Sequence, residues 1–486
     1  MRRPDLEPCL STSASRPSPV RTVGLINLLK GGDGRPLHLV IYHRIRHLIA
    51  TGALPAGTRL PSSRALAGDL GVARNTVVEA IELLVADGWI ETRRGSGAYV
   101  AEEPPRVATK PPPPAPEGAA ERLTDDLPFS VGIPGLGLFR ADAWNRVQAR
   151  CWRSMPREAL LEGHPLGWPA LREVVASQVQ ITRGVVCSPE QVIITSGARN
   201  ALDLTVRALL GPGSRAVVED PGYFAVSETL RWNGVTPAPS PVDAQGLRLP
   251  DPSEAARMAV MTPACEFPLC AVMSPNRRQA WTAWAAERGG WIFEDDYDSE
   301  FHFEGQSLPP LAAQPGASRV IYANSFNKLL FPSLRLGYLI VPTSLVELFA
   351  KAALELQVNA GIPNQVVLAE FIRDGHLDRH LRTARTAYGA RRRRLVAALE
   401  QELAGFLEIR RQPVGLHLVA RILRGSEAEW IALAAERGVH LVGMSRFATA
   451  PAEPGVLLGF AGFDVSDLQA AAAELGRAAR AHFGSA

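Results

Sequence analysis

A lysine stands between a hydroxyl group and an arginine in the segment YANSFNKLLFPSLRLGY, residues 322–338. Lys328 follows Ser325 by three residues and precedes Arg335 by seven. A lysine in a polar loop is usually only solvated and then has no chemical role. Beside a hydroxyl and a fixed cation, however, its amine can attach a ligand that carries a phosphate group. The side chains of neighbouring segments distinguish between these two interpretations.

Two other segments carry side chains suited to such a ligand. The acidic run FEDDYDSEF (293–301) follows an apolar strand and places Asp295 and Tyr297 at the carboxyl end of that strand, where open α/β sheets bind ligands. The run ITSGARNALDL (194–204) passes from a strand into a helix, whose first N–H groups suit a phosphate. Taken singly, the acidic run is a solvated strand end or a possible metal site, and the Ser-Gly turn is only a helix cap.

Together these groups meet the requirements of pyridoxal phosphate. This cofactor needs a lysine for covalent attachment, a carboxylate for the pyridine nitrogen, a donor for the ring oxygen and ligands for the phosphate. The chain offers them in the order phosphate turn, acidic strand end, lysine, arginine. The sequence therefore predicts a pyridoxal phosphate pocket at the strand ends of an α/β sheet.

The elements that must position these residues alternate along the chain from about residue 125 onward. Apolar runs in QVIITSG, RAVVED, WIFEDD and RVIYANS predict strands, the last of them over Ser318–Tyr322. Helices are expected over 200–210 and 278–288. Strands that alternate with helices predict a parallel sheet covered on both faces.

The segment RLPSSRALAGDLGVARNTVVEAIELLVADGWIETRRGSGAYV (59–100) has a different spacing, that of a winged helix-turn-helix. Ser62 or Ser63 can cap a first helix that runs to Leu70, and Gly71 permits the turn. A second helix is expected over Ala73–Ala86. Two short strands would follow, around the basic tip Arg93-Arg94-Gly95-Ser96-Gly97.

The second helix would expose Arg74, Asn75 and Thr76 at its start, the part that enters the major groove in this motif. The alternative is a small helical protein-contact domain with a solvated charged face, because residues 36–100 carry seven arginines against five acidic residues. The spacing of capped helix, glycine turn, polar helix start and basic hairpin favours DNA binding.

Composition sets limits on the whole chain. At 486 residues, with 46% hydrophobic and 21% charged residues, the chain suits a soluble protein of more than one domain, and a net charge of +3 does not by itself indicate a polyanionic partner. No apolar run approaches the roughly 20 residues of a membrane helix, and the start of the chain is not a secretory signal. The cysteines show no CxxC spacing, which predicts a cytoplasmic protein without a metal site. They are Cys9, Cys151, Cys187, Cys265 and Cys270.

Domain boundaries follow from local composition. Residues 101–120 contain seven prolines, which favour an extended spacer. The expected parts are a disordered extension over 1–24, a DNA-binding head over 25–100, a proline-rich linker over 101–124 and a large α/β domain over 125–486.

Both parts resemble known families. The run LPSSRALAGDLGVARNT is similar to the GntR-type winged helix, and the large part resembles fold-type I aminotransferases in GHPLGWPALR, ITSGARNALDL, EDPGYFAV, EDDYDSEFHFEG and NSFNKLLFPSLRLGY. Over about residues 25–480 the chain resembles the MocR family of GntR-type regulators, which fuse the two. The fold implied is an α+β winged helix-turn-helix head joined to a large α/β fold-type I aminotransferase-like domain that binds pyridoxal phosphate.

The resemblance also implies roles for individual residues. Lys328 would form the internal aldimine, Asp295 would pair with the pyridine nitrogen, and Tyr297 would bond the ring hydroxyl. Tyr223 would cover the ring face, and Ala198, Ser325 and Arg335 would hold the phosphate. The DNA contacts would be Arg64, Arg74, Asn75, Thr76, Arg94 and Gly95. Arg446, in GMSRFAT, is a candidate for an effector carboxylate from its position alone.

The chain departs from the family pattern in three places. Where the family usually has TPSHQFPTG, residues 262–274 read TPACEFPLCAVMS, so that Cys265, Glu266, Leu269 and Cys270 replace His, Gln, Thr and Gly. The usual Tyr-Gly-Asp-Pro is EGHP, with Glu162 and His164 in the altered places, and Asn327 replaces a serine before the lysine. These changes bear on the substrate side of the pocket and on any turnover.

Three functions are compatible with these features. The first is a transcription factor that senses an amine, an amino acid or the cofactor. The second is a working aminotransferase with an accessory head, and the third is a dimerisation scaffold without cofactor. The groove-reading helix favours the first over the second, and the intact lysine set disfavours the third. The expected partners are operator DNA, a small amine or amino-acid effector and a second copy of the chain, in a homodimer that binds two half-sites.

Overall fold

The computed structural model of the protein describes residues 36–93, 95–105, 127–161, 164–358 and 360–484. The chain divides into two compact units, residues 1–121 and 122–486, which are considered one at a time below. The extension expected over 1–24, most of the linker expected over 101–124, and Arg94 and Glu162 lie outside the described residues.

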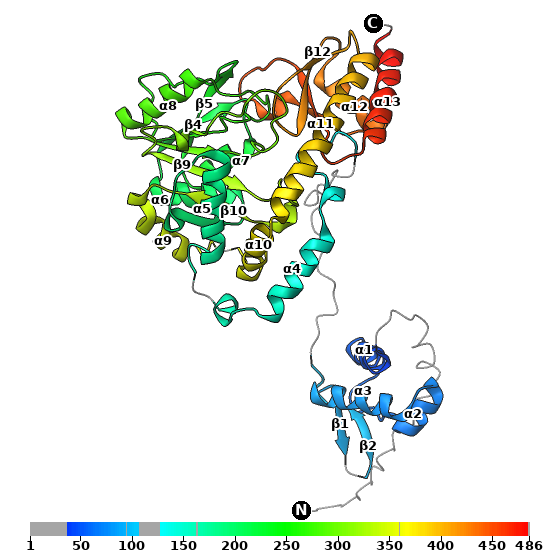
Figure 1. The fold of residues 1–486 in the computed structure, drawn as a ribbon. Helices are drawn as coiled ribbons and strands as arrows, with labels where there is room; N and C mark the ends of the chain where they lie inside the picture. Colours follow the sequence, from blue (N-terminus) through cyan, green and yellow to red (C-terminus); the bar gives the residue numbers. More distant parts are fainter. Residues whose placement is uncertain (1–35, 94, 106–126, 162–163, 359, 485–486) are drawn as a thin grey trace, which may run out of the picture. The chain divides into compact units, whose positions relative to one another are not determined.

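The small unit is a winged helix (Figure 1). Its elements are α1 (Leu37–Ala50), α2 (Ser63–Leu70), α3 (Arg74–Ala86) and an antiparallel hairpin of β1 (Ile90–Arg93) with β2 (Gly97–Val100). Ser62 Oγ accepts a hydrogen bond from the N–H of Ala65 at 3.2 Å and caps α2, as expected. Gly71 ends the same helix in the left-handed conformation, at φ 66°. The second helix begins at Arg74, one residue later than expected.

The core of the small unit explains why one side of α3 remains free. Val77, Ala80 and Leu84 lie at helical spacing and are fully buried together with Ile41 and Ile45 of α1. The polar start of α3 therefore points away from the core.

The large unit contains a central sheet of eight strands in the order β3-β10-β9-β8-β7-β4-β5-β6. The strands are β3 (Val192–Thr195), β4 (Arg215–Asp220), β5 (Thr236–Asp243), β6 (Gly246–Leu247), β7 (Met258–Met261), β8 (Trp291–Asp295), β9 (Val320–Ser325) and β10 (Gly337–Ile340). The helices around it are α4 (Ala141–Arg153), α5 (Pro169–Arg183), α6 (Ala198–Leu209), α7 (Phe224–Trp232), α8 (Pro275–Arg288), α9 (Val346–Glu355) and α10 (Ile362–Arg373).

Helices cover both faces of this sheet, as the sequence predicts. Ile321 of β9 packs on one face with Leu204 of α6 and Phe349 of α9. Its neighbour Tyr322 packs on the opposite face with residues of α5 and α10. Alternate residues of one strand thus enter two separate cores, as the two-residue period of a strand requires.

The expectation of a purely parallel sheet was wrong at two strands. β4, β5, β7, β8 and β9 pair in parallel, but β10 is antiparallel to both β3 and β9, and β6 is antiparallel to β5. β9 ends at Ser325 and β10 begins at Gly337, which leaves too short a connection for the crossover of about a dozen or more residues that parallel strands need. β9 also extends three residues beyond the strand expected over Ser318–Tyr322, so it ends directly at Ser325.

A second sheet, which the sequence analysis did not anticipate, forms the C-terminal part of the large unit. Its order is β11-β12-β14-β13, and all its pairs are antiparallel. The strands are β11 (Leu407–Arg410), β12 (His417–Ile422), β13 (Val442–Gly443) and β14 (Gly455–Gly459). The long helix α11 (His376–Glu402) leads into this part, which also contains α12 (Glu427–Glu436) and α13 (Val465–Phe483) and is yellow to red in Figure 1.

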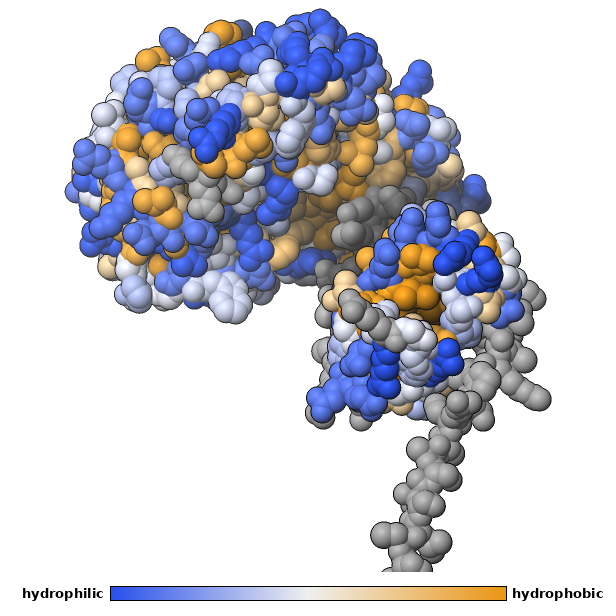
Figure 2. Space-filling view, turned by 90° about the horizontal axis from the view of Figure 1, so that it is seen from below, coloured by the Kyte–Doolittle hydropathy of each residue, from blue (hydrophilic) through white to orange (hydrophobic). Residues whose placement is uncertain are grey.

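In the described part of the chain, none of the helices combines the length and the apolar character needed to cross a bilayer. The face of the large unit seen in Figure 2 is largely hydrophilic, with apolar residues in scattered groups.

Candidate functional site

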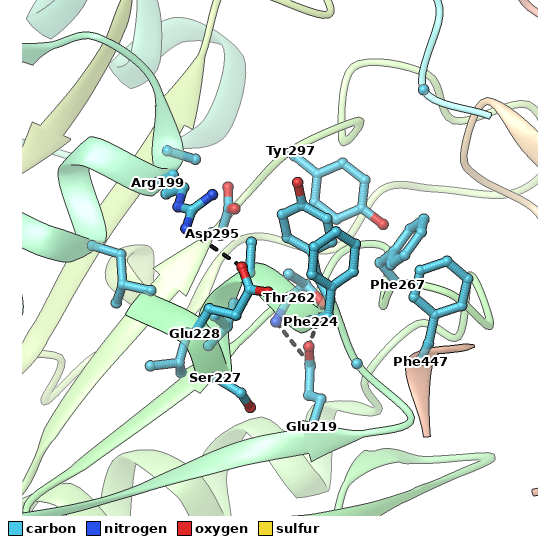
Figure 3. A pocket seen from close by; sticks show the side chains of 18 of the residues that line it. Arg199, Glu219, Phe224, Ser227, Glu228, Thr262, Phe267, Asp295, Tyr297 and Phe447 are labelled. Atoms are coloured by element: carbon cyan, nitrogen blue, oxygen red, sulfur yellow. Dashed lines mark hydrogen bonds and ion pairs between the residues drawn. The ribbon is translucent and has the colours of Figure 1, made fainter. Parts of the chain in front are cut away.

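A cavity of about 600 Å³ opens at the carboxyl ends of β4, β7 and β8 in the large unit. It brings together every residue of that unit to which the sequence analysis gave a ligand-binding role. These are Ala198, Tyr223, Asp295, Tyr297, Ser325, Lys328, Arg335 and Arg446. Figure 3 shows Asp295 and Tyr297 in its wall, with Phe224, Phe267 and Phe447 close by.

Three polar atoms in the cavity wall are buried and lack a hydrogen-bond partner among the described residues. They are Oδ1 of Asp295, the hydroxyl of Tyr297 and Oδ1 of Asp298. Burial raises the pKa of Asp295 to about 7, although the nearby Lys328 acts in the opposite direction. Burial also holds the pKa of Tyr297 well above its usual value, so the phenol stays protonated. A buried group without a partner is costly, and a ligand that supplies one removes the cost.

Lys328 lies beside these residues. Its Nζ is 4.3 Å from the centre of the Tyr297 ring and 3.9 Å from Oδ2 of Asp298, which is long for an ion pair. Its side chain is 33% exposed, and it lines the cavity. The amine is therefore reachable from the cavity and is not locked into a tight pair.

The start of α6 forms one end of the cavity. Gly197 precedes the helix at φ 119° and ψ 176°, a conformation that essentially only glycine adopts. A Cβ at this position would also lie 3.0 Å from Nδ2 of Asn327. No side chain caps α6, so its first N–H groups remain available to an anion.

The loop between β9 and β10 brings three further polar residues to this end. Ser325 Oγ accepts from the N–H of Asn327 at 3.2 Å and can donate to the carbonyl of Leu336 at 3.4 Å. Asn327 Oδ1 accepts from the N–H of Leu336 at 3.1 Å. Arg335 is held in the left-handed conformation at φ 53° and lines the cavity, with no carboxylate at ion-pair distance among the described residues.

The opposite end of the cavity is aromatic. Tyr223 is the N-cap residue of α7, and its ring meets the edge of Phe267 at 5.7 Å between centroids. Arg446 lies in the short 3₁₀ helix η9 (Met444–Phe447), with its guanidinium 5.6 Å from the centre of the Phe224 ring.

Most of the altered segment 262–274 stands behind this wall and not in it. Of that segment, Thr262 and Phe267 line the cavity, whereas Cys265, Glu266, Leu269 and Cys270 do not. Cys270 Sγ lies 3.3 Å from Nε2 of His417, and Glu266 accepts from the N–H of Leu269 at 2.9 Å. Glu266, Leu269 and Cys270, expected on the substrate side of the pocket, therefore do not line the cavity, and Leu269 and Cys270 contact residues of the C-terminal sheet instead.

Some lining residues had no sequence signal. Glu219 receives hydrogen bonds from the N–H and the hydroxyl of Thr262, both at 2.8 Å, and burial raises its pKa to about 7. Phe447 also lines the cavity. Their positions depend on contacts between distant segments, which spacing along one chain does not reveal. Within the described residues, no group of three or more His, Cys, Asp or Glu side chains is arranged to hold a metal ion.

In the small unit, the candidate DNA contacts gather on α2, α3 and the wing. Arg64, Arg74, Asn75 and Gly95 are exposed, and Thr76 is half-buried. Arg74 Nε donates to Ser63 Oγ at 3.4 Å, and Ala73 caps α3 without a side-chain hydrogen bond. On the wing, Arg93 lies over the Tyr99 ring at 4.7 Å, a position that the sequence analysis did not single out.

Comparison with known proteins agrees with both units. The model of the bacterial regulatory proteins of the gntR family matches residues 37–100, and that of aminotransferase class I and II matches residues 130–475. The probable rhizopine catabolism regulatory protein MocR of Rhizobium meliloti is 35% identical over 447 residues, which cover 88% of this chain and 91% of that protein. The pyridoxine biosynthesis transcriptional regulator PdxR of Corynebacterium glutamicum is 30% identical, over 89% of this chain and 93% of its own.

Among solved structures, the α-aminoadipate aminotransferase LysN of Thermus thermophilus, complexed with N-(5'-phosphopyridoxyl)-L-leucine, superposes with a TM-score of 0.66. It is 26% identical and covers 73% of this chain and 92% of its own. A GntR-type DNA-binding head followed by a fold-type I aminotransferase-like domain defines a class of transcriptional regulators. The chain belongs to the MocR family of that class, as its motifs indicate.

Proposed function

We propose that this transcriptional regulator senses a small amine, an amino acid or pyridoxal phosphate itself through pyridoxal phosphate held in the cavity of the large unit. One observation carries the proposal. The cavity that contains Lys328 also contains the partnerless Oδ1 of Asp295 and the partnerless hydroxyl of Tyr297. A ring with one cationic nitrogen and one anionic oxygen would supply both missing partners.

The remaining groups of the cofactor also find suitable residues. Lys328 Nζ would attach it covalently, and Arg335, Ser325 and the start of α6 from Ala198 would hold the phosphate. Tyr223 would lie against the ring. When bound, pyridoxal phosphate supplies an electrophilic carbon that an incoming amine can attack in place of the lysine.

A displaced lysine amine would have a partner nearby. Asp298 Oδ2 is 3.9 Å from Nζ, and Oδ1 of the same carboxylate is buried without a partner among the described residues. Arg446, at the far end of the cavity, suits the carboxylate of an amino acid. Ligand binding can then alter DNA affinity only if the ligand favours one of two arrangements of the protein.

The proposed assembly is a cytoplasmic homodimer. Two copies of the chain would present two heads to two half-sites of an operator, because a two-fold axis in the protein matches a palindromic DNA site. Arg64, Arg74, Asn75, Thr76, Arg94 and Gly95 would contact that DNA.

The absorbance spectrum tests the cofactor directly. Purified protein supplied with pyridoxal phosphate should absorb in the visible, and Lys328→Ala should remove this band and the response of operator binding to amines. Lys351→Ala is the matched control, because Lys351 is an exposed lysine of α9 outside the cavity. Wild-type protein that stays colourless with added cofactor would favour a dimerisation scaffold.

The same lysine set supports a second candidate function, an active aminotransferase with an accessory head. Lys328 lines the cavity, and its amine would move a proton at a bound substrate. Repeated turnover of an amino donor is the measurement that would favour it.

A further inference from the structure

Four aromatic side chains form a closed ring of contacts at the mouth of the cavity. Tyr223 meets Phe267 at 5.7 Å, Phe267 meets Phe447 at 4.9 Å, Phe447 meets Phe224 at 6.5 Å, and Phe224 returns to Tyr223 at 5.1 Å, all between ring centroids. We call this set the aromatic ring cluster. Figure 3 shows three of its members, Phe224, Phe267 and Phe447, grouped on one side of the pocket.

Hydrogen bonds fix the cluster although its members come from three distant segments. The N–H of Gly222 donates to the carbonyl of Phe447 at 2.9 Å. The N–H and hydroxyl of Thr449 donate to the carboxylate of Asp220 at 2.8 and 2.5 Å. The end of β4 and residues 447–449 are thereby joined beside the cluster, so the rings form a pre-arranged surface.

The cluster leaves apolar surface open toward the cavity. Tyr223, 48% exposed, would lie against the cofactor ring, and Phe224, 37% exposed, offers its surface to the ligand. Removing such surface from water is favourable, and a further ring gains edge-to-face contacts as well. An aliphatic side chain as small as that of alanine would cover little of it.

The charges around the cluster select against a second cation on the ligand. Aromatic cages often bind ammonium groups, but here the guanidinium of Arg446 already lies over Phe224 at 5.6 Å and has no carboxylate at ion-pair distance among the described residues. Behind the cluster, His417 packs edge-on to Phe267 at 5.4 Å, and burial lowers its pKa to about 4, so it is neutral. Among the described residues, the charged group in contact with the cluster is therefore positive, and the nearby carboxylate of Asp220 is hydrogen-bonded to Thr449.

We propose that the ligand sensed at this site is an amino acid with an aromatic side chain. Its ring completes the aromatic ring cluster and its carboxylate pairs with Arg446. This proposal rests on the proposed function, because the amine of the ligand would be the group that competes with Lys328.

The experiment is a calorimetric titration of the full-length protein, supplied with pyridoxal phosphate, with four ligands. Phenylalanine should bind about tenfold or more tightly than alanine, because a buried aromatic ring is worth at least that factor. Lysine should bind most weakly because of its second cation, and phenethylamine should bind less tightly than phenylalanine because it has no carboxylate.

Variants assign the preference to the cluster. Phe447→Leu and, separately, Phe224→Leu should reduce the preference for phenylalanine over alanine to a few-fold. Arg446→Gln should remove the preference for phenylalanine over phenethylamine. Trp232→Leu is the control, because Trp232 is 84% exposed on α7 and does not line the cavity.

Two outcomes would overturn the proposal. Alanine within about threefold of phenylalanine in the wild-type protein would do so, as would an unchanged preference in both leucine variants. The visible band, recorded on the same samples, separates this failure from that of the cofactor. A colourless protein that still ranks phenylalanine first contradicts the proposed cofactor, whereas a coloured protein with a flat ranking contradicts the aromatic ligand.

Discussion

Buried in the cavity wall without a partner for Oδ1 among the described residues, the carboxyl group of Asp295 has a pKa of about 7 and not its usual 3.8. The folded protein then holds this proton more tightly than the unfolded chain does. The stabilisation is complete below about pH 4 and is lost as the pH rises through about 7. Glu219 and Glu300 also have pKa values raised to about 7 by burial, so a variant is needed to isolate Asp295.

Asp295→Asn is that variant, because asparagine has nearly the same shape as aspartate and carries no titratable carboxyl group. Without cofactor, the wild-type protein should lose up to about 4 kcal/mol more of its free energy of unfolding between pH 4 and pH 8 than Asp295→Asn loses. Urea unfolding at the two pH values measures the difference. Added pyridoxal phosphate should narrow the difference by placing a cationic nitrogen beside the carboxylate, and parallel pH curves without cofactor would show that the Asp295 carboxyl is not perturbed.

Site residues at strand ends could be predicted from the sequence, whereas those contributed by distant segments could not. Asp295, Tyr297 and Lys328 were predictable, because the ends of parallel strands meet at one edge of a sheet. Phe267 and Phe447 were not, since 180 positions of chain separate them and only packing brings their rings to 4.9 Å. Cys270 was assigned to the wall from its sequence position, whereas its side chain contacts His417 behind it.

Among the elements, α3 is the one that should read DNA. Arg74→Ala should weaken operator binding by about 1–3 kcal/mol if the side chain contacts a base. The fold should persist, because Arg74 is exposed and its described side-chain hydrogen bond, to Ser63, is long at 3.4 Å. Fluorescence anisotropy with labelled operator measures the effect, and Arg44→Ala, an exposed arginine of α1, serves as control. Equal affinities of the Arg74→Ala and wild-type proteins would remove Arg74 from the contact surface.

The turn into α6 should be equally sensitive, for a backbone reason. Gly197→Ala places a Cβ in a region of φ and ψ that is strained for alanine and 3.0 Å from Asn327 Nδ2. We expect a loss of about 1–3 kcal/mol in stability and at least a tenfold loss of cofactor affinity. The cofactor affinity is read from the visible band during titration.

Gly184→Ala is the control for this prediction. Gly184 ends α5 at φ 72°, so alanine is strained there too, but a Cβ would meet nothing within 4 Å and the residue does not line the cavity. It should lose stability and keep cofactor affinity. Equal cofactor affinities of the two variants would show that the α6 turn does not hold the phosphate.

Helix and strand positions were largely readable from the sequence, whereas strand directions were not. The helices α2 and α3 of the head fall within one residue of their expected bounds, because a serine cap and a glycine turn mark them. The antiparallel β10 was missed, since the apolar pattern of a strand is the same in either direction. The C-terminal sheet was missed because its strands are short, and β13 spans only Val442–Gly443.

For the whole molecule, the expected behaviour is ligand-dependent DNA binding with slow or absent turnover. Transamination requires Lys328 Nζ to move a proton at a substrate carbon whose breaking bond is held in line. The candidate that would hold the substrate carboxylate, Arg446, is an exposed residue of a short 3₁₀ helix, and its guanidinium lies over Phe224. An arginine in this position can bind the carboxylate of a ligand, but it does not fix the orientation of the substrate bond that must break.

A screen of amines and amino acids tests this expectation. Spectral change, keto-acid production and operator binding are followed in parallel, so that turnover and ligand-dependent DNA binding are both measured. A ligand that changes operator affinity should have its own affinity changed by operator DNA by the same factor, because binding linkage is reciprocal. Rapid multiple turnover with no effect of any ligand on DNA binding would instead favour an active aminotransferase with an accessory head. The division of labour between head and large domain was readable from the sequence, since each part has its own motifs, whereas the ligand was not.

The two ends of the cavity are encoded by different stretches of the chain. The ends of β8 and β9 and the start of α6 supply one end, whereas Arg446 and Phe447 of η9 supply much of the other. After a gene duplication, substitutions near position 446 would therefore change the ligand that is sensed. The cofactor-binding end of the cavity and the DNA-binding head would stay the same. Paralogues in one genome would then differ first at η9, so that their ligands would change before their operator sequences do.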